Sequence, residues 1–67
     1  MNTLYEIKDR NEDGTDNGSF TIAVYKVEDG VVRAAKTDKK GNPTTNFINY
    51  TAKEFQTGIR LGTVVRL

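Results

Sequence analysis

Apolar side chains recur at every second position through most of this 67-residue chain. Such alternation predicts β-strands that bury one face, whereas the 3.6-residue spacing of an amphipathic helix appears only once, in a short stretch. Clusters of Gly, Asn, Asp and Pro separate the alternating segments and favour turns. The sequence therefore predicts one small all-β domain spanning residues 1–67. The predicted strands are 3–10, 20–28, 31–37, 44–50 and 59–67.

The strongest local signal is Asp29-Gly30, which stands between two alternating segments. A two-residue Asp-Gly loop favours a type I′ turn, so we expect a tight hairpin between strands 20–28 and 31–37. Segment 20–28 is apolar on both faces, which is typical of a central strand. Residues 11–19, in contrast, are nine turn-forming residues with no apolar member, and they predict a long, mobile, acidic loop.

Thr51 and Glu54 have the spacing of a capping box at the start of a helix. They predict a short helical turn over residues 52–57, closed by Gly58. The last predicted strand follows directly. Its apolar and polar residues alternate, which predicts the set of side chains that face the core. That set is Ile59, Leu61, Val65 and Leu67.

Four strands, a short helical turn and a fifth strand are the order of a small SH3-like barrel, here five-stranded, antiparallel and partly open. An OB-fold normally places its helix between the third and fourth strands, and a four-strand sheet with a longer helix would need 59–67 to be helical. Gly58, Gly62 and the β-branched run 63–65 disfavour that longer helix. Four aromatic side chains are predicted to lie in the core: Tyr5, Phe20, Phe47 and Phe55.

The composition excludes several kinds of chemistry. The chain has no Cys and no His, which rules out a Cys/His zinc site, a disulfide, a thiol nucleophile and a Ser-His-Asp triad. Glu6, Glu28 and Glu54 show no paired spacing for acid–base catalysis, and no Gly-rich phosphate loop precedes a helix. We therefore expect a protein that is not an enzyme and binds no cofactor.

A membrane location is not expected either. The longest uninterrupted apolar run is 22–25, far shorter than the ~20 residues that span a bilayer. Residues 1–6 lack the basic and apolar regions of a signal peptide. The expected location is the cytoplasm.

The formal net charge of +1 hides an asymmetry between the two halves of the chain. Residues 1–30 hold three basic and seven acidic side chains, whereas residues 31–67 hold seven basic and two acidic ones. Either the halves neutralise each other across strand pairs, or the basic half forms a separate surface for an anionic partner.

Binding of a protein partner, or of a second copy of the chain, is the first functional expectation. The acidic loop 11–19 would select a basic partner, and an exposed barrel edge would accept an additional strand. Small domains with thin cores are also commonly supplemented by a subunit interface. The chain is therefore expected to act as a binding or assembly module.

Nucleic-acid binding is the alternative. A basic surface within residues 31–67 would suit a phosphate backbone, and exposed tyrosines beside it would stack on bases. Lysines on edge strands, however, also prevent edge-to-edge aggregation. The predicted contact residues are Arg33, Lys36, Lys39, Lys40, Arg60, Arg66, Tyr25 and Tyr50.

Calcium is the one metal for which a partial motif exists. Asp9, Asn11 and Asp13, followed by Gly14, match the first half of a calcium-binding loop. The twelfth position is Phe20, where that loop requires a bidentate Glu. We therefore expect an acidic, solvated loop without a metal. The candidate ligands are these three residues, a set that the Thr15 carbonyl and Asn17 could extend.

Overall fold

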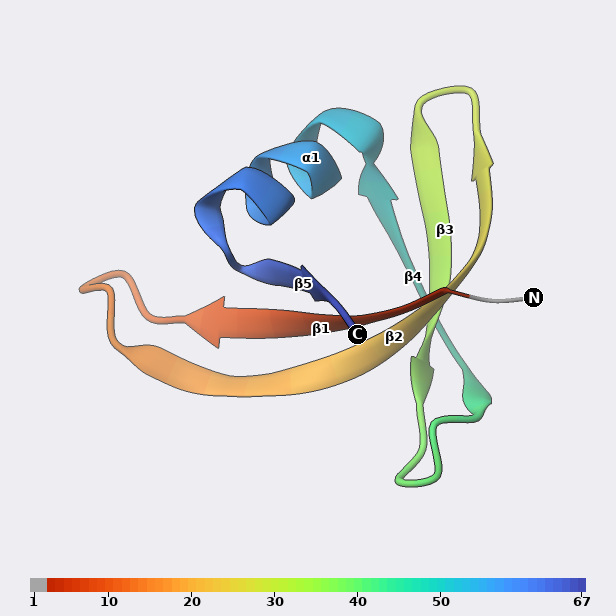
Figure 1. The fold of residues 1–67 in the computed structure, drawn as a ribbon, viewed down its shortest axis with the longest axis horizontal. Helices are drawn as coiled ribbons and strands as arrows, with labels where there is room; N and C mark the ends of the chain where they lie inside the picture. The colour runs from red at the N-terminus through yellow and green to blue at the C-terminus, as the bar shows by residue number, and fades with distance from the viewer. Residues whose placement is uncertain (1–2) are drawn as a thin grey trace.

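The computed structural model describes residues 3–67 (Figure 1). Its elements are β1 (Thr3–Arg10), β2 (Asp16–Glu28), β3 (Val31–Thr37), β4 (Pro43–Thr51), α1 (Ala52–Leu61) and β5 (Val64–Arg66). The five strands form one antiparallel sheet with the spatial order β4-β3-β2-β1-β5. Because β4 and β5 end the sheet without pairing with each other, it is not fully closed. The predicted all-β class, with five antiparallel strands and one helix before the last, is confirmed.

The hairpin between β2 and β3 has the predicted geometry. Asp29 and Gly30 have φ angles of 51° and 75°, and positive φ at both central residues is what a type I′ turn requires. Strands β1 and β3 also have the predicted bounds. These elements are predictable from local sequence, because the turn residues and the alternating apolar residues on both sides of the turn indicate the same hairpin.

Strand β2 begins at Asp16 and not at the predicted Phe20, so the preceding turn covers only 11–15. The extra residues pair with β1, in a register that sets Arg10 opposite Asp16 and Lys8 opposite Ser19. This part of the ribbon is exposed on both faces and needs only backbone hydrogen bonds, so its polar sequence gave no strand signal.

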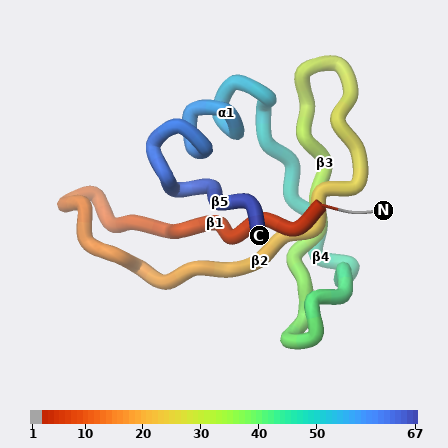
Figure 2. Tube along the Cα trace, in the orientation of Figure 1, coloured from red at the N-terminus to blue at the C-terminus, as the bar shows by residue number. Residues whose placement is uncertain are grey.

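The sheet is strongly coiled around β2. The first part of β2 pairs with β1 and its second part pairs with β3, with a register irregularity between Val24 and Lys26 that bends the strand. As a result, β3 and β4 run across the direction of β1 (Figure 1). In the trace of Figure 2, α1 lies on one side of the β1–β2 ribbon and the turn 38–42 lies on the other. The two faces of the sheet therefore differ in their cover.

Helix α1 extends to Leu61, beyond the predicted end at residue 57. The Thr51 hydroxyl accepts from the Glu54 N–H at 3.1 Å and donates to the Glu54 carboxylate at 2.8 Å, which confirms the predicted start. Gly58 lies inside the helix and does not close it. The closing residue is Gly62, which has φ 84° and donates its N–H to the carbonyls of the last turn.

The longer helix shortens the last strand and reverses its predicted facing. Ile59 and Leu61 belong to α1, so their spacing carries no information about strand facing. In β5, Val64 pairs with Ile7 and is 8% exposed, while Val65 pairs with Glu6 on the opposite face. The prediction that Val65 points inward is therefore wrong by one residue.

The core lies between α1 and the face of the sheet that α1 covers. Its buried members are Ile22, Val32, Ala34, Phe55 and Val64. The ring of Phe55 stands edge-on to the ring of Tyr5 at 4.9 Å between centroids, and 5.8 Å from that of Tyr50. Tyr5 and Phe20 pack half-buried around this cluster. The core positions predicted for these two side chains and for Phe55 are confirmed.

Candidate interaction surfaces

Strand β4 is one edge of the sheet, and its outer side has no neighbouring strand among residues 3–67. Its sequence is Pro-Thr-Thr-Asn-Phe-Ile-Asn-Tyr-Thr, without a single Lys, Arg, Asp or Glu. Edge strands commonly carry charges, bulges or prolines that prevent pairing with another chain. Here Pro43 stands at the first position only, and the register irregularity lies between its pairing with Thr37 and the Phe47 pairing with Ala35. The segment 47–51 is thus a regular and unprotected edge.

The hydrogen-bond alternation identifies which groups of β4 face outward. The Ala52 N–H donates to the Gly30 carbonyl at 2.7 Å, so this residue faces β3. In an antiparallel ladder the facing alternates, and Ile48 therefore also directs its backbone groups toward β3. Phe47 and Asn49 consequently present their backbone N–H and C=O groups at the free edge.

An exposed aromatic pair lies beside this edge, on the face of the sheet opposite α1. Tyr25 is 46% exposed and Phe47 is 64% exposed, and their ring centroids are 6.1 Å apart in an edge-to-face arrangement. The rings come from β2 and β4 and meet across β3, where Ala35 is 1% exposed and leaves room for them. The prediction that Phe47 lies in the core is therefore wrong. We call Tyr25 and Phe47 the aromatic pair.

The face of the sheet on which Phe47 lies could have been predicted from the sequence. Ile48 and Tyr50 are apolar neighbours at a spacing of two, which puts them on the core face and puts Phe47 on the other. The structure has that arrangement, with Ile48 and Tyr50 packed against the core. Burial also raises the pKa of the Tyr50 phenol. The two tyrosines predicted to stack on bases, Tyr25 and Tyr50, thus lie on opposite faces.

The predicted basic residues do not share one surface. Arg33 lies between buried Val32 and Ala34 and so faces away from the core, on the same side as the aromatic pair. Lys36 is three residues further along β3 and faces the other way, with its ammonium 4.5 Å from the centroid of the Phe20 ring. The remaining four lie elsewhere. Lys39 and Lys40 are in the β3–β4 turn, Arg60 is on the outer side of α1, and Arg66 is exposed on β5.

The two halves of the chain are not joined by ion pairs within residues 3–67. The pairs present are Arg10 with Asp16 at 4.0 Å and Lys26 with Glu28 at 3.1 Å, and all four residues belong to the acidic half. Arg33, next to the aromatic pair, has no carboxylate partner within 4.0 Å in this part of the chain. On the face of the sheet that carries the aromatic pair, its guanidinium is therefore a free positive charge near Phe47 in the sheet register.

The three candidate calcium ligands form hydrogen bonds with residues of the acidic loop. Asp9 accepts from the Asn17 side chain at 3.2 Å, and Asn11 donates its side-chain amide to the Thr15 hydroxyl at 2.9 Å. Asp13 accepts from both the hydroxyl and the backbone N–H of Thr15, at 2.6 and 3.0 Å. Over the described residues no three His, Cys, Asp or Glu side chains are placed to hold a metal ion.

These hydrogen bonds affect the pKa of Asp13, which can be tested by titration. The Thr15 hydroxyl, followed by the Thr15 backbone N–H, lowers the pKa of Asp13 below its ordinary value. Because the folded-state pKa is depressed, the stabilisation is present above the unfolded pKa and is lost as the pH falls through the folded pKa. We expect Thr15→Val to raise the Asp13 pKa, measured by NMR titration of its carboxyl carbon. The control Thr45→Val is expected to leave it unchanged, and an unshifted Asp13 in T15V would contradict the assignment.

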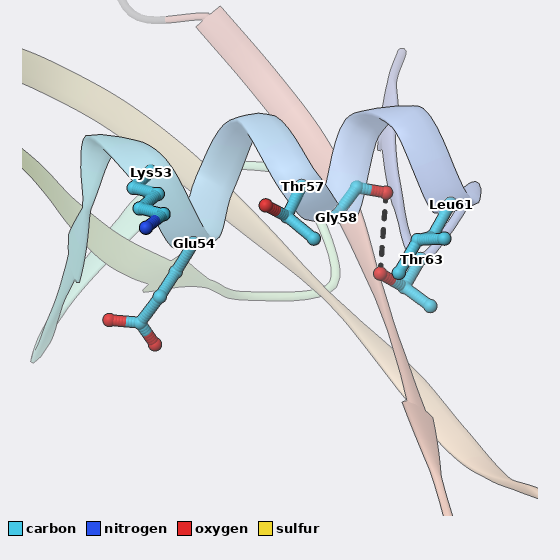
Figure 3. Close-up of a pocket in the computed structure, with 6 residues that line it drawn as sticks. All are labelled: Lys53, Glu54, Thr57, Gly58, Leu61 and Thr63. Atoms are coloured by element: carbon cyan, nitrogen blue, oxygen red, sulfur yellow. Dashed lines mark hydrogen bonds between the residues drawn. The ribbon is translucent and has the colours of Figure 1, made fainter.

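Shallow grooves border α1, and two of them involve apolar side chains. One lies along its outer side and is formed by Lys53, Glu54, Thr57, Gly58, Leu61 and Thr63 (Figure 3). There the Thr63 hydroxyl donates to the Gly58 carbonyl at 3.3 Å, and Leu61 is 67% exposed. The other lies between α1 and the β2–β3 hairpin, where Val27 and Ile59 leave apolar surface exposed. The first groove is lined mainly by polar side chains and the second mainly by apolar ones.

Comparisons with known proteins give no relative for this chain. No protein-family model, no curated protein and no solved structure matches it. The resemblance of the strand order to SH3-like barrels therefore stays a prediction. Within the described residues, α1 is the one helix, and it is too short and too polar to cross a membrane.

Proposed function

We propose that this chain is a non-catalytic binding module that adds a strand from a protein partner to the free edge of β4. The observation that carries the proposal is the uncharged, unpaired segment 47–51, with backbone groups of Phe47 and Asn49 directed outward. In strand addition, main-chain hydrogen bonds supply affinity and alternating side chains supply selectivity. This is the barrel-edge form of the protein-binding expectation, and the acidic loop has no comparable supporting geometry.

The aromatic pair supports the same proposal. A strand added at β4 runs past Phe47, whose exposed ring provides an apolar contact for a partner side chain on the same face of the sheet. Tyr and Arg are also enriched among the residues that dominate binding energy at protein interfaces, and Tyr25 and Arg33 lie on this face. An apolar or aromatic residue in an extended peptide is therefore the expected recognition element.

The test is selection from a random library of displayed peptides, followed by NMR mapping on the labelled chain. We expect bound peptides to shift the amide signals of Phe47 and Asn49 and to slow hydrogen exchange at both. Asn49→Pro removes an outward N–H, which an edge strand tolerates, and is expected to weaken binding at least tenfold. Arg66→Pro makes the same type of change at the opposite edge of the sheet and is expected to have little effect. Peptides that bind N49P as well as the unchanged chain would contradict the proposal.

Single-stranded nucleic acid is a second candidate, and the aromatic pair next to Arg33 favours it. Exposed aromatic rings on an open sheet face stack on bases, and a nearby guanidinium contacts phosphate. The discriminating measurement is the affinity for an oligothymidine strand between low and physiological salt, because phosphate contacts make affinity fall steeply with salt. Binding that is lost on Arg33→Glu and depends steeply on salt would favour this candidate over the peptide.

A further inference from the structure

The β4 edge has a property that bears on the identity of its partner, and the inference that follows rests on the proposed function. When two copies of one strand pair across a twofold axis, each side chain meets its own counterpart or a near neighbour of it. A charged strand would then oppose like charges, which destabilises strand pairing. Strand β4 carries no Lys, Arg, Asp or Glu, so this repulsion is absent. We infer that the occupant of the β4 edge is β4 of a second copy of this chain.

The outward groups define the register of this pairing. Phe47 and Asn49 are two residues apart, and both face the free edge. In an antiparallel pair, Phe47 of each copy then lies opposite Asn49 of the other and exchanges both backbone hydrogen bonds with it, about four bonds in all. Ile48 comes to lie on the axis, opposite Ile48 of the second copy. The result is a continuous sheet that runs through both copies.

This register also joins the two cores. Ile48 and Tyr50 are half-buried members of the core that stand on the edge strand, so the core is open at this side. With Ile48 of the two copies in a non-hydrogen-bonded pair, their side chains approach most closely on the face that α1 covers. The apolar layer then continues across the axis, which complements a core whose cluster has only five buried side chains in the described chain.

The second copy fits this edge better than an unrelated peptide does in one respect. An unrelated peptide must supply its own apolar residue opposite Ile48, whereas a second copy supplies Ile48 itself in the required position. The charged ends of the ribbon do not interfere, because the acidic turn 11–15 belongs to the β1–β2 hairpin and extends away from β4 (Figure 1). The aromatic pairs of the two copies lie on the same face of the joined sheet.

The experiment introduces charge at Asn49 and then restores complementarity. The unchanged chain is expected to have the mass of a dimer by light scattering and to dissociate on dilution. Asn49→Lys and Asn49→Glu, each alone, are expected to raise the dimer dissociation constant at least tenfold, since like charges then meet near the axis. A mixture of N49K and N49E is expected to form a mixed dimer, identified by its mass in native mass spectrometry. Recovery in the mixture is a signature that only self-pairing near Asn49 produces.

The matched control places the same charges away from the edge. Asn42 is exposed in the β3–β4 turn, and Asn42→Lys and Asn42→Glu are expected to leave the dissociation constant unchanged. A chain that is monomeric up to millimolar concentration, or a dimer insensitive to both Asn49 variants, would overturn the inference. A monomer whose selected peptides lose affinity on N49P overturns self-pairing but leaves the proposed function intact. A monomer that selects no peptide defeats both.

Discussion

Replacing Phe55 with alanine is expected to lower the free energy of unfolding by about 3–5 kcal/mol, the range for a buried Phe truncated in a core. Phe55 is 7% exposed, and its ring contacts those of Tyr5 and Tyr50. It is also the only buried side chain that α1 contributes to the core; the other buried residue of the helix is a glycine. Its loss therefore detaches the helix from the sheet as well as leaving a cavity.

The effect is large relative to the stability of a chain of this size. Domains have about 0.05–0.15 kcal/mol of stability per residue, which gives several kcal/mol here. F55A is accordingly expected to be largely unfolded at 37 °C, measured by far-ultraviolet circular dichroism during urea titration. The control is Phe47→Ala, the same chemical change at a ring that is 64% exposed. A loss of about 1 kcal/mol or less is expected there, and equal losses in the two variants would contradict the assignment of Phe55 to the core.

The parts of the fold that were predictable from sequence are those specified by neighbouring residues. Asp29-Gly30 has the conformational preference of its turn, and the alternation on both sides supports the same hairpin. Thr51 and Glu54 likewise marked the first turn of α1. These signals need no knowledge of the rest of the chain, because the interacting groups are at most a few residues apart.

The parts that were not predictable depend on contacts between distant segments. From its neighbours in sequence, Gly58 is predicted to end the helix. In the structure the helix continues through Gly58, and the close packing of β5 against this position explains why the residue is a glycine. Ile59 and Leu61 alternate as a strand would, but they are helical because α1 ends at Gly62. Local propensity was overridden by tertiary structure in both cases.

The candidate site also combines features that were predictable from neighbouring residues with features that depend on contacts between distant segments. Arg33 and Lys36 are three residues apart on a strand, so their opposite facing follows from the alternation alone. The meeting of Tyr25 with Phe47 does not, because it requires that β2 and β4 flank the same strand and that β3 carry a small residue between them. The free edge of β4 is likewise a property of strand order, which sequence alternation does not specify.

Gly58→Ala is expected to destabilise the chain although alanine is the better helix former. The helix preference favours alanine by about 1 kcal/mol in a helix interior. A Cβ at position 58, however, would lie 2.5 Å from Val64 Cγ2 and 3.2 Å from the Thr63 hydroxyl oxygen. Val64 is buried and branched, so it has little freedom to move aside. Overpacking of a core costs about 1–3 kcal/mol, and at so short a distance we expect the upper part of that range and a net loss of stability.

A double-mutant cycle with Val64→Ala tests whether this contact is the cause. Val64→Ala alone removes buried methyl groups and is expected to destabilise the chain. In the double variant the Cβ at position 58 occupies part of the space that Val64 vacates, so the two losses in unfolding free energy should sum to more than the measured loss. Gln56→Ala, an exposed substitution two residues earlier on α1, controls for helix propensity. If G58A is more stable than the unchanged chain, or its effect adds to that of V64A without coupling, the close approach of α1 and β5 is not what requires glycine at this position.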